Sequence, residues 1–111
     1  MSIAKTEEFS VKDNKIARYA KALSHPARIA IIKVLLKESS CICGDIVDQL
    51  PLSQSTVSLH LKELKEAGLI KGEISGAKVC YCLDHKEWEL AKKYYNEFFN
   101  SIPACSSDNC C

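Results

Sequence analysis

The chain has 111 residues, of which 47% are hydrophobic and 26% charged, and its formal net charge at pH 7 is +1. This length supports one hydrophobic core and excludes a second, and the composition is that of an ordinary globular domain. The small net charge excludes DNA affinity that rests on overall charge, so any such affinity must come from local clusters or from dimer symmetry.

The N-terminal sequence MSIAKTEEFSVKDNK lacks an apolar stretch of signal-peptide length, and no later run is long and apolar enough for a bilayer. We therefore expect a cytoplasmic protein with no membrane partner. Thiols stay reduced in that compartment, and the chain has seven cysteines, an odd number. This usage favours metal or redox chemistry over a framework of disulfides.

Helical periodicity begins at residues 13–23, where a thin apolar stripe predicts a helix that must pack on another element. Pro26 suits the first turn of a second helix. The sequence ARIAIIKVLLK that follows is apolar nearly all round, which is typical of a central, buried helix. Farther on, CICGDIVDQL has the spacing of a short helix that starts near Cys43, with Cys41 and Ile42 as extended residues ahead of it.

Residues 52–70 predict the helix around which the rest of the chain is organised. Ser53 can accept a hydrogen bond from a first-turn amide. Val57, Leu61 and Leu64 recur at helical spacing and predict one narrow buried face. Gly68 suits a left-handed cap. With the short helix before it, this segment predicts a helix-turn-helix.

The outward face of this helix has short hydrogen-bonding side chains on its first turns and lysines behind them. Such side chains can reach base edges in the major groove while the cations contact phosphate. An ordinary solvated helix face is the alternative interpretation. The candidate DNA-binding residues are Gln54, Ser55, Thr56, Ser58, Leu59, Lys62 and Lys65 on the helix, and Lys78 beyond it.

Residues 73–84 predict a β-hairpin whose turn lies at 75–77, with Cys80 and Cys82 on the face opposite the apolar one. A last helix is expected over about 86–101. Its apolar stripe is broader than one small core can cover, so we expect part of it to contact a second subunit. The predicted domain is 1–102, followed by a flexible cysteine-containing tail at 103–111.

This order of elements, with SHPAR, the CxC motif and SQSTVSLHLKELKEAGLI, resembles the ArsR/SmtB family over about residues 15–101. The resemblance implies a mainly α (α+β) winged helix-turn-helix with about five helices and a two- to three-stranded β-wing. It also implies a homodimer through the first and last helices, binding to double-stranded operator DNA, and release by a toxic metal or metalloid.

The CxC motif offers thiolates at Cys41 and Cys43, which bind soft ions far better than hard ones. Amide dipoles at a helix start near Cys43 would favour its thiolate form. Arsenic-responsive members of the family have CxCxxC here, whereas this chain has Ile46 at the third position. We expect the third sulfur from the tail, which can span at most ~30 Å. The tail cysteines are Cys110, Cys111 and Cys105.

The predicted function is that of a repressor induced by As(III), or by Sb(III) or methylarsenite. A thiol-redox or Cd/Pb-responsive repressor of the same fold is one alternative, and a thiol metal carrier without DNA specificity is another. An enzyme is not expected, because periodicity assembles no nucleophile–base arrangement and the sequence has no Gly-rich phosphate loop.

Some of these residues also have plain structural interpretations. Cys43 could be a small buried side chain, since free cysteine is among the most buried residue types. The tail could be inert. Cys80 and Cys82 share a strand face and could bind a metal, but we interpret them as surface residues. His60 is expected to pack against or cap the DNA-reading helix rather than bind an ion.

Overall fold

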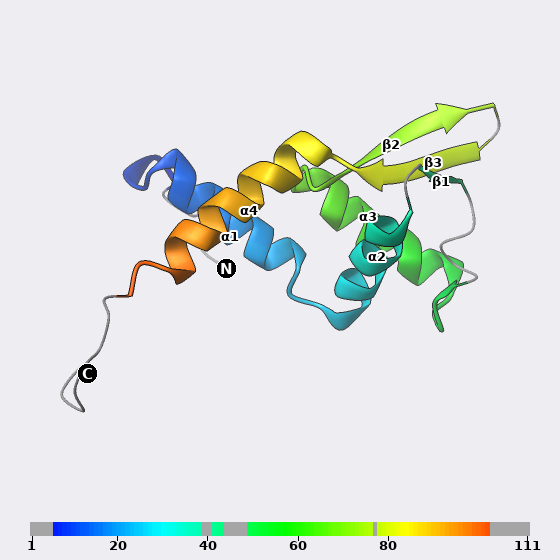
Figure 1. The fold of residues 1–111 in the computed structure, drawn as a ribbon. Coiled ribbons are helices and arrows are strands. Elements are labelled where there is room, and N and C mark those ends of the chain that lie inside the picture. Colours follow the sequence, from blue (N-terminus) through cyan, green and yellow to red (C-terminus); the bar gives the residue numbers. More distant parts are fainter. Residues whose placement is uncertain (1–5, 39–40, 44–48, 77, 103–111) are drawn as a thin grey trace.

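The structure is a computed structural model that describes residues 6–38, 41–43, 49–76 and 78–102. Figure 1 shows the hairpin projecting at one end of the molecule, while the first and last helices lie side by side at the other. In chain order the elements are a 3-10 helix at Thr6–Glu8, α1 at Val11–Ala22, α2 at Pro26–Lys37, β1 at Ile42–Cys43, α3 at Gln54–Glu66, β2 at Ile70–Ser75, β3 at Lys78–Leu83 and α4 at His85–Phe99.

These elements confirm the winged helix-turn-helix arrangement expected from the sequence. The described residues contain four α-helices rather than about five, since the short helix expected before α3 falls mainly on 44–48, outside them. The hairpin of β2 and β3 forms the wing, and β1 adds a third strand to its sheet. Within the part of the chain that the structure describes, no helix is both long enough and apolar enough to cross a membrane.

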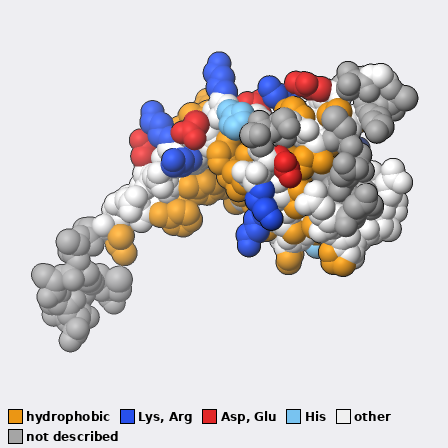
Figure 2. Space-filling model, turned by 45° about the vertical axis from the view of Figure 1, so that its right-hand side comes forward, with side chains coloured by type: hydrophobic (Ala, Val, Ile, Leu, Met, Phe, Trp, Pro, Cys, Tyr) orange, Lys and Arg blue, Asp and Glu red, His pale blue; other side chains and the backbone are white. Residues whose placement is uncertain are grey.

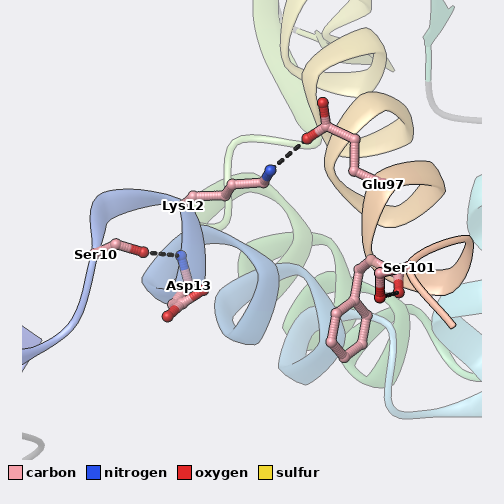
Figure 3. A network of polar contacts seen from close by, with 6 residues as sticks. Ser10, Lys12, Asp13, Glu97 and Ser101 are labelled. Carbon is pink, nitrogen blue, oxygen red and sulfur yellow. Dashed lines mark hydrogen bonds and ion pairs between the residues drawn. The ribbon is translucent and has the colours of Figure 1, made fainter. Parts of the chain in front are cut away.

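Each α-helix begins where a side chain can accept a hydrogen bond from its first turn. Ser10 Oγ accepts from the Asp13 amide at 3.0 Å, so α1 begins two residues before the predicted start (Figure 3). His25, Ser53 and Asp84 play the same part for α2, α3 and α4. These acceptors satisfy amides that have no partner inside the helix.

The core lies between the helices and the sheet, and its fully buried side chains include Tyr19, Ile31, Leu64 and Leu69. Helix α2 contributes one face to it, through Ile31, Ile32 and Leu35. The prediction that α2 is buried nearly all round is wrong, because 50% of Leu36 is exposed.

The sheet has the strand order β1-β3-β2, with both pairs antiparallel. Gly68 has φ +86° and its amide donates to the Lys65 carbonyl at 2.9 Å, which confirms the predicted left-handed cap of α3. Gly76 has φ +64° in the hairpin turn. The hairpin begins at Ile70, three residues earlier than predicted.

The carboxylate of Glu87 in α4 connects that helix to α1. Glu87 Oε2 accepts hydrogen bonds from the Tyr19 hydroxyl and, at 3.1 Å, from Lys15 Nζ. The Tyr19 hydrogen bond, helped by Lys15, holds the pKa of Glu87 below its ordinary value. At the other end of the pair, Lys12 forms an ion pair with Glu97 (Figure 3).

Replacing Glu87 with glutamine should therefore reduce stability and change its dependence on pH. A carboxyl whose pKa is lowered by folding stabilises the protein above its unfolded pKa, and that contribution disappears as pH falls through the folded value. We expect Glu87→Gln to lower the free energy of unfolding at pH 7 by about 1.5–3 kcal/mol, the range for a hydrogen bond to a charged group.

Urea unfolding at several pH values between neutral and acidic tests this expectation. The variant should lose less stability on acidification than the natural chain does. Parallel stability curves for the two proteins would contradict the role given to Glu87.

Candidate functional site

Helix α3 buries the face that the sequence predicted and leaves the other face in solvent. Val57, Leu61 and Leu64 are buried, together with His60. Ser53 caps the helix, and its hydroxyl donates to Thr56 Oγ1 at 2.9 Å. The structure thus confirms both the start and the orientation of the helix.

The predicted DNA-binding side chains of α3 point away from the core. Thr56 is half-buried, and Leu59 is 66% exposed, as its helical angle predicted. A methyl group at Gly72 of β2 would lie 3.6 Å from Lys65 Nζ, so Lys65 extends toward the wing. The side chain of Lys78 lies outside the described residues. The remaining exposed candidates are Gln54, Ser55, Ser58 and Lys62.

His60 packs at the junction of α2 and α3, as expected. Its ring centroid lies 4.5 Å from that of His25, and its Nδ1 accepts a hydrogen bond from Arg28 Nε at 3.1 Å. Burial is the main cause that lowers the pKa of His60, and the neighbouring His25 and Arg28 act in the same direction. The neutral ring therefore has a packing role that fixes α3 on α2.

The CxC motif lies on a strand that pairs with the wing. Ile42 is opposite Tyr81, and Cys43 is opposite Cys80. The prediction that a helix starts near Cys43 needs correction, because the structure assigns Cys43 to β1, where cross-strand hydrogen bonds hold the backbone extended. Among the described residues no helix begins at Cys43, so helix amides do not account for a thiolate there.

The interpretation of the wing cysteines as surface residues is also wrong. Only 3% of Cys80 is exposed, and Cys82 is half-buried. β1 pairs with this strand along the edge opposite β2. A disulfide joins Cys41 to Cys82, and the two Cα atoms are 4.4 Å apart.

Glu73 of β2 completes a group that could hold a metal ion. One ligand atom from each of Cys41, Cys82 and Glu73 lies within 4.8 Å of the other two. They line a pocket of about 180 Å³ that Lys71 and His85 also border. Two thiolates and a carboxylate form a donor set suited to a thiophilic divalent cation.

Sequence reasoning missed Cys82 and Glu73 as members of this group. A signal for Cys82 was present, because Cys80 and Cys82 repeat the two-residue spacing of Cys41 and Cys43. Two such pairs on antiparallel strands can face each other. The predicted tail ligands, Cys105, Cys110 and Cys111, lie outside the described residues.

The contact between Cys41 and Cys82 leads to a prediction about oxidation. Mild oxidant without metal should join these two residues, because their Cα separation lies within the range of disulfides. Peptide mass spectrometry of the oxidised chain should recover this cross-link, and Cys82→Ser should abolish it. Recovery of a Cys41–Cys43 bond in the natural chain, with Cys82 still open to alkylation, would contradict the geometry.

Comparison with known proteins gives a consistent assignment. Residues 25–71 match the family model described as "Bacterial regulatory protein, arsR family". The uncharacterised HTH-type transcriptional regulator MJ1325 of Methanocaldococcus jannaschii is 37% identical over 83 residues, which cover 73% of this chain and 92% of that protein. The HTH-type transcriptional repressor SmtB of Mycobacterium tuberculosis is 47% identical over 66 residues, 59% of this chain. That match spans about half of the repressor, 48% of its length.

Solved structures show the same fold. The homodimeric winged helix-turn-helix DNA-binding domain of Mb0332 from Mycobacterium bovis aligns with a TM-score of 0.63 and 18% identity, covering 94% of this chain and 97% of that one. The cadmium sensor CMTR of Mycobacterium tuberculosis aligns with a TM-score of 0.54 and 32% identity, covering 86% and 95% of the two chains. From the helix α3, the wing and these relatives, we conclude that the chain belongs to the ArsR family of bacterial regulatory proteins.

Proposed function

We propose that this chain is a homodimeric transcriptional repressor that releases its operator when a thiophilic ion binds at the CxC motif. One observation carries the proposal, the contact between Cys41 and Cys82. It joins the segment that leads to α3 to the wing. In a winged helix, α3 and the wing are the elements presented to DNA. An ion held by these sulfurs is therefore placed to change how the two elements sit relative to each other.

The exposed face of α3 supports DNA reading. Ser55, Ser58 and Leu59 are exposed near the beginning of the helix, and the cationic Lys62 follows one turn later. Hydroxyl groups can bind base edges, and an apolar side chain can contact the methyl group of thymine. Lys62 is placed to contact phosphate, which contributes affinity without sequence preference.

An apolar surface at the ends of α1 and α4 supports the predicted dimer. Figure 2 shows hydrophobic side chains gathered along the narrow end of the molecule. A monomer has no reason to expose so many large apolar groups on two helices that already pack together. The residues and their exposed fractions are Phe9 61%, Val11 72%, Phe98 57%, Phe99 69% and Ile102 72%.

A two-fold dimer requires an operator with inverted half-sites. Their centres should be one helical turn, ~10 bp, or a multiple of that apart, because each α3 must reach the same side of the duplex.

As(III) is the inducer that we propose, with Sb(III) and methylarsenite as related ligands. The sulfurs of Cys41 and Cys43 suit these ions, and As(III) needs three sulfurs in a pyramid. The relatives support a soft-metal inducer more generally, since CMTR is a cadmium sensor. An inducer that favours the DNA-incompetent arrangement by ~3–5 kcal/mol would weaken operator binding by some hundred- to thousand-fold.

The role of Leu59 can be tested by changing it to glutamine. If Leu59 contacts a thymine methyl group, Leu59→Gln should cost about 1–3 kcal/mol at one base pair of each half-site, since that is the range for a single mismatched base contact. The salt dependence should not change. Fluorescence anisotropy with a set of single-base operator variants measures this, and equal losses on every sequence would contradict the contact.

Lys62→Ala is the matched variant on the same face. It should weaken specific and non-specific DNA to a similar extent and reduce the salt slope by about one unit. A change in base preference in this variant would assign Lys62 to base recognition instead.

The sulfur role is tested by separate Cys41→Ser and Cys43→Ser variants of the reduced protein on labelled operator DNA. Each should still bind the operator, yet need at least ~10-fold more arsenite for release, since loss of even a supporting group around a metal typically costs 10- to 100-fold. Release at the arsenite concentration that suffices for the natural chain would exclude the CxC motif as the inducer site.

A repressor of the same family that responds to thiol oxidation is the second candidate, and the disulfide contact between Cys41 and Cys82 favours it. Such a protein would release its operator with peroxide in the absence of metal and regain it with dithiothreitol. A thiol metal carrier would instead bind ions without any operator preference.

A further inference from the structure

The three strands of the wing bring two rows of chemically reactive side chains together. Cys80 of β3 is opposite Cys43 of β1 on one side and opposite Glu73 of β2 on the other. In the neighbouring row, Cys82 is opposite Lys71 on the β2 side. On the β1 side, the Cα atoms of Cys82 and Cys41 are 4.4 Å apart.

The side chains of Cys80, Cys82, Lys71 and Glu73 lie on one face of the sheet. Side chains two residues apart on a strand share a face, and residues opposite each other across antiparallel strands do so as well. The Cα separation of Cys41 and Cys82 is typical of a non-hydrogen-bonded pair, in which the side chains are closest. The fold therefore brings Cys41 to the face of β3 that carries Cys80 and Cys82, although these residues lie about forty positions away in the sequence.

We propose that the reduced protein binds a thiophilic divalent cation, such as Zn²⁺ or Cd²⁺, through Cys41, Cys82 and Glu73. In the disulfide-bonded structure the ligand atoms of these residues lie within 4.8 Å of one another, beside a pocket of about 180 Å³. The site needs no sulfur from the tail. Only its regulatory consequence rests on the proposed function, because ion binding itself can be measured without DNA.

Ion binding starts from the reduced chain, in which an external thiol reductant has supplied two electrons and two protons to the Cys41–Cys82 disulfide. Each of the two thiols loses one proton as its sulfur bonds to the cation, so two protons leave for every ion bound. The two thiolates and the Glu73 carboxylate carry three negative charges against two positive ones. Lys71, which is opposite Cys82 and borders the pocket, offsets the excess.

The position of the site gives it a mechanical effect. Cys41 directly precedes β1, and Cys82 lies near the end of β3, two residues before the cap of α4. An ion between them holds the approach to α3 against the wing. Binding therefore holds the segment that leads to α3 at one position on the wing.

The experiment is a Cd²⁺ titration of the reduced full chain, followed by the sulfur-to-cadmium charge-transfer absorbance. Cys82→Ser should lose part of this band and bind Cd²⁺ at least ~100-fold more weakly, because loss of a direct ligand exceeds the 10- to 100-fold typical of a supporting group. Glu73→Gln should weaken binding while leaving the sulfur band in place. The matched control, C105S/C110S/C111S, should bind like the natural chain.

Full affinity and a full band in Cys82→Ser, or their loss in the tail variant, would overturn the proposal. A measurement on the natural chain avoids any folding defect of the variants, since bound Cd²⁺ should protect Cys41 and Cys82 from alkylation. Alkylation of Cys82 at an unchanged rate would overturn the proposal as well.

Operator DNA separates this inference from the proposed function. If Cd²⁺ binds through Cys82 but leaves the operator complex intact, the site stands and the regulatory role fails. If Cd²⁺ releases the operator equally well from Cys82→Ser, the repressor stands and the wing site is wrong.

Discussion

The antiparallel pairing of β1 with β3 is the interaction on which the rest of the account depends. β1 has only two residues, Ile42 and Cys43, yet it brings the segment ahead of the recognition helix onto the wing. Without this pairing, Cys41 would be a sulfur near a helix-turn-helix and Cys82 a sulfur on a hairpin. With it, the two sulfurs are in contact and connect the segment that leads to α3 with the wing.

Strand β3 also connects the wing to the expected dimer surface. β3 ends at Leu83, and the next residue, Asp84, donates its amide to the Leu69 carbonyl and caps α4 with its carboxylate. Glu87, one turn into α4, is bound by Tyr19 of α1. A change at the sulfur cluster thus has a short, hydrogen-bonded connection to the helices that we propose to form the dimer.

Much of this fold could be predicted from sequence, because its signals are local. The buried face of α3, its Ser53 cap and its Gly68 terminus depend on residues within one helix, and periodicity identified them. The exposure of Leu59 also followed from its helical angle. In these cases, the chain segment itself contains the physical cause.

The sulfur cluster depends on pairing between residues that lie about forty positions apart, a sequence separation of 41 for Cys41 and Cys82. Periodicity gives no information on such pairs, so Cys80 and Cys82 were assigned to the surface and Cys43 to a helix. The exposure of Leu36 was missed for a related reason, because an apolar helix does not reveal which of its faces has a neighbour.

Thermodynamic linkage tests the central claim most directly, namely that ion binding at these sulfurs and DNA binding at α3 oppose each other. The measurement is the affinity of the reduced protein for Cd²⁺ with and without saturating operator DNA. If the two sites are coupled, the operator must weaken Cd²⁺ binding by the same factor by which Cd²⁺ weakens operator binding. Equal Cd²⁺ affinities in the free protein and in the operator complex would contradict the account.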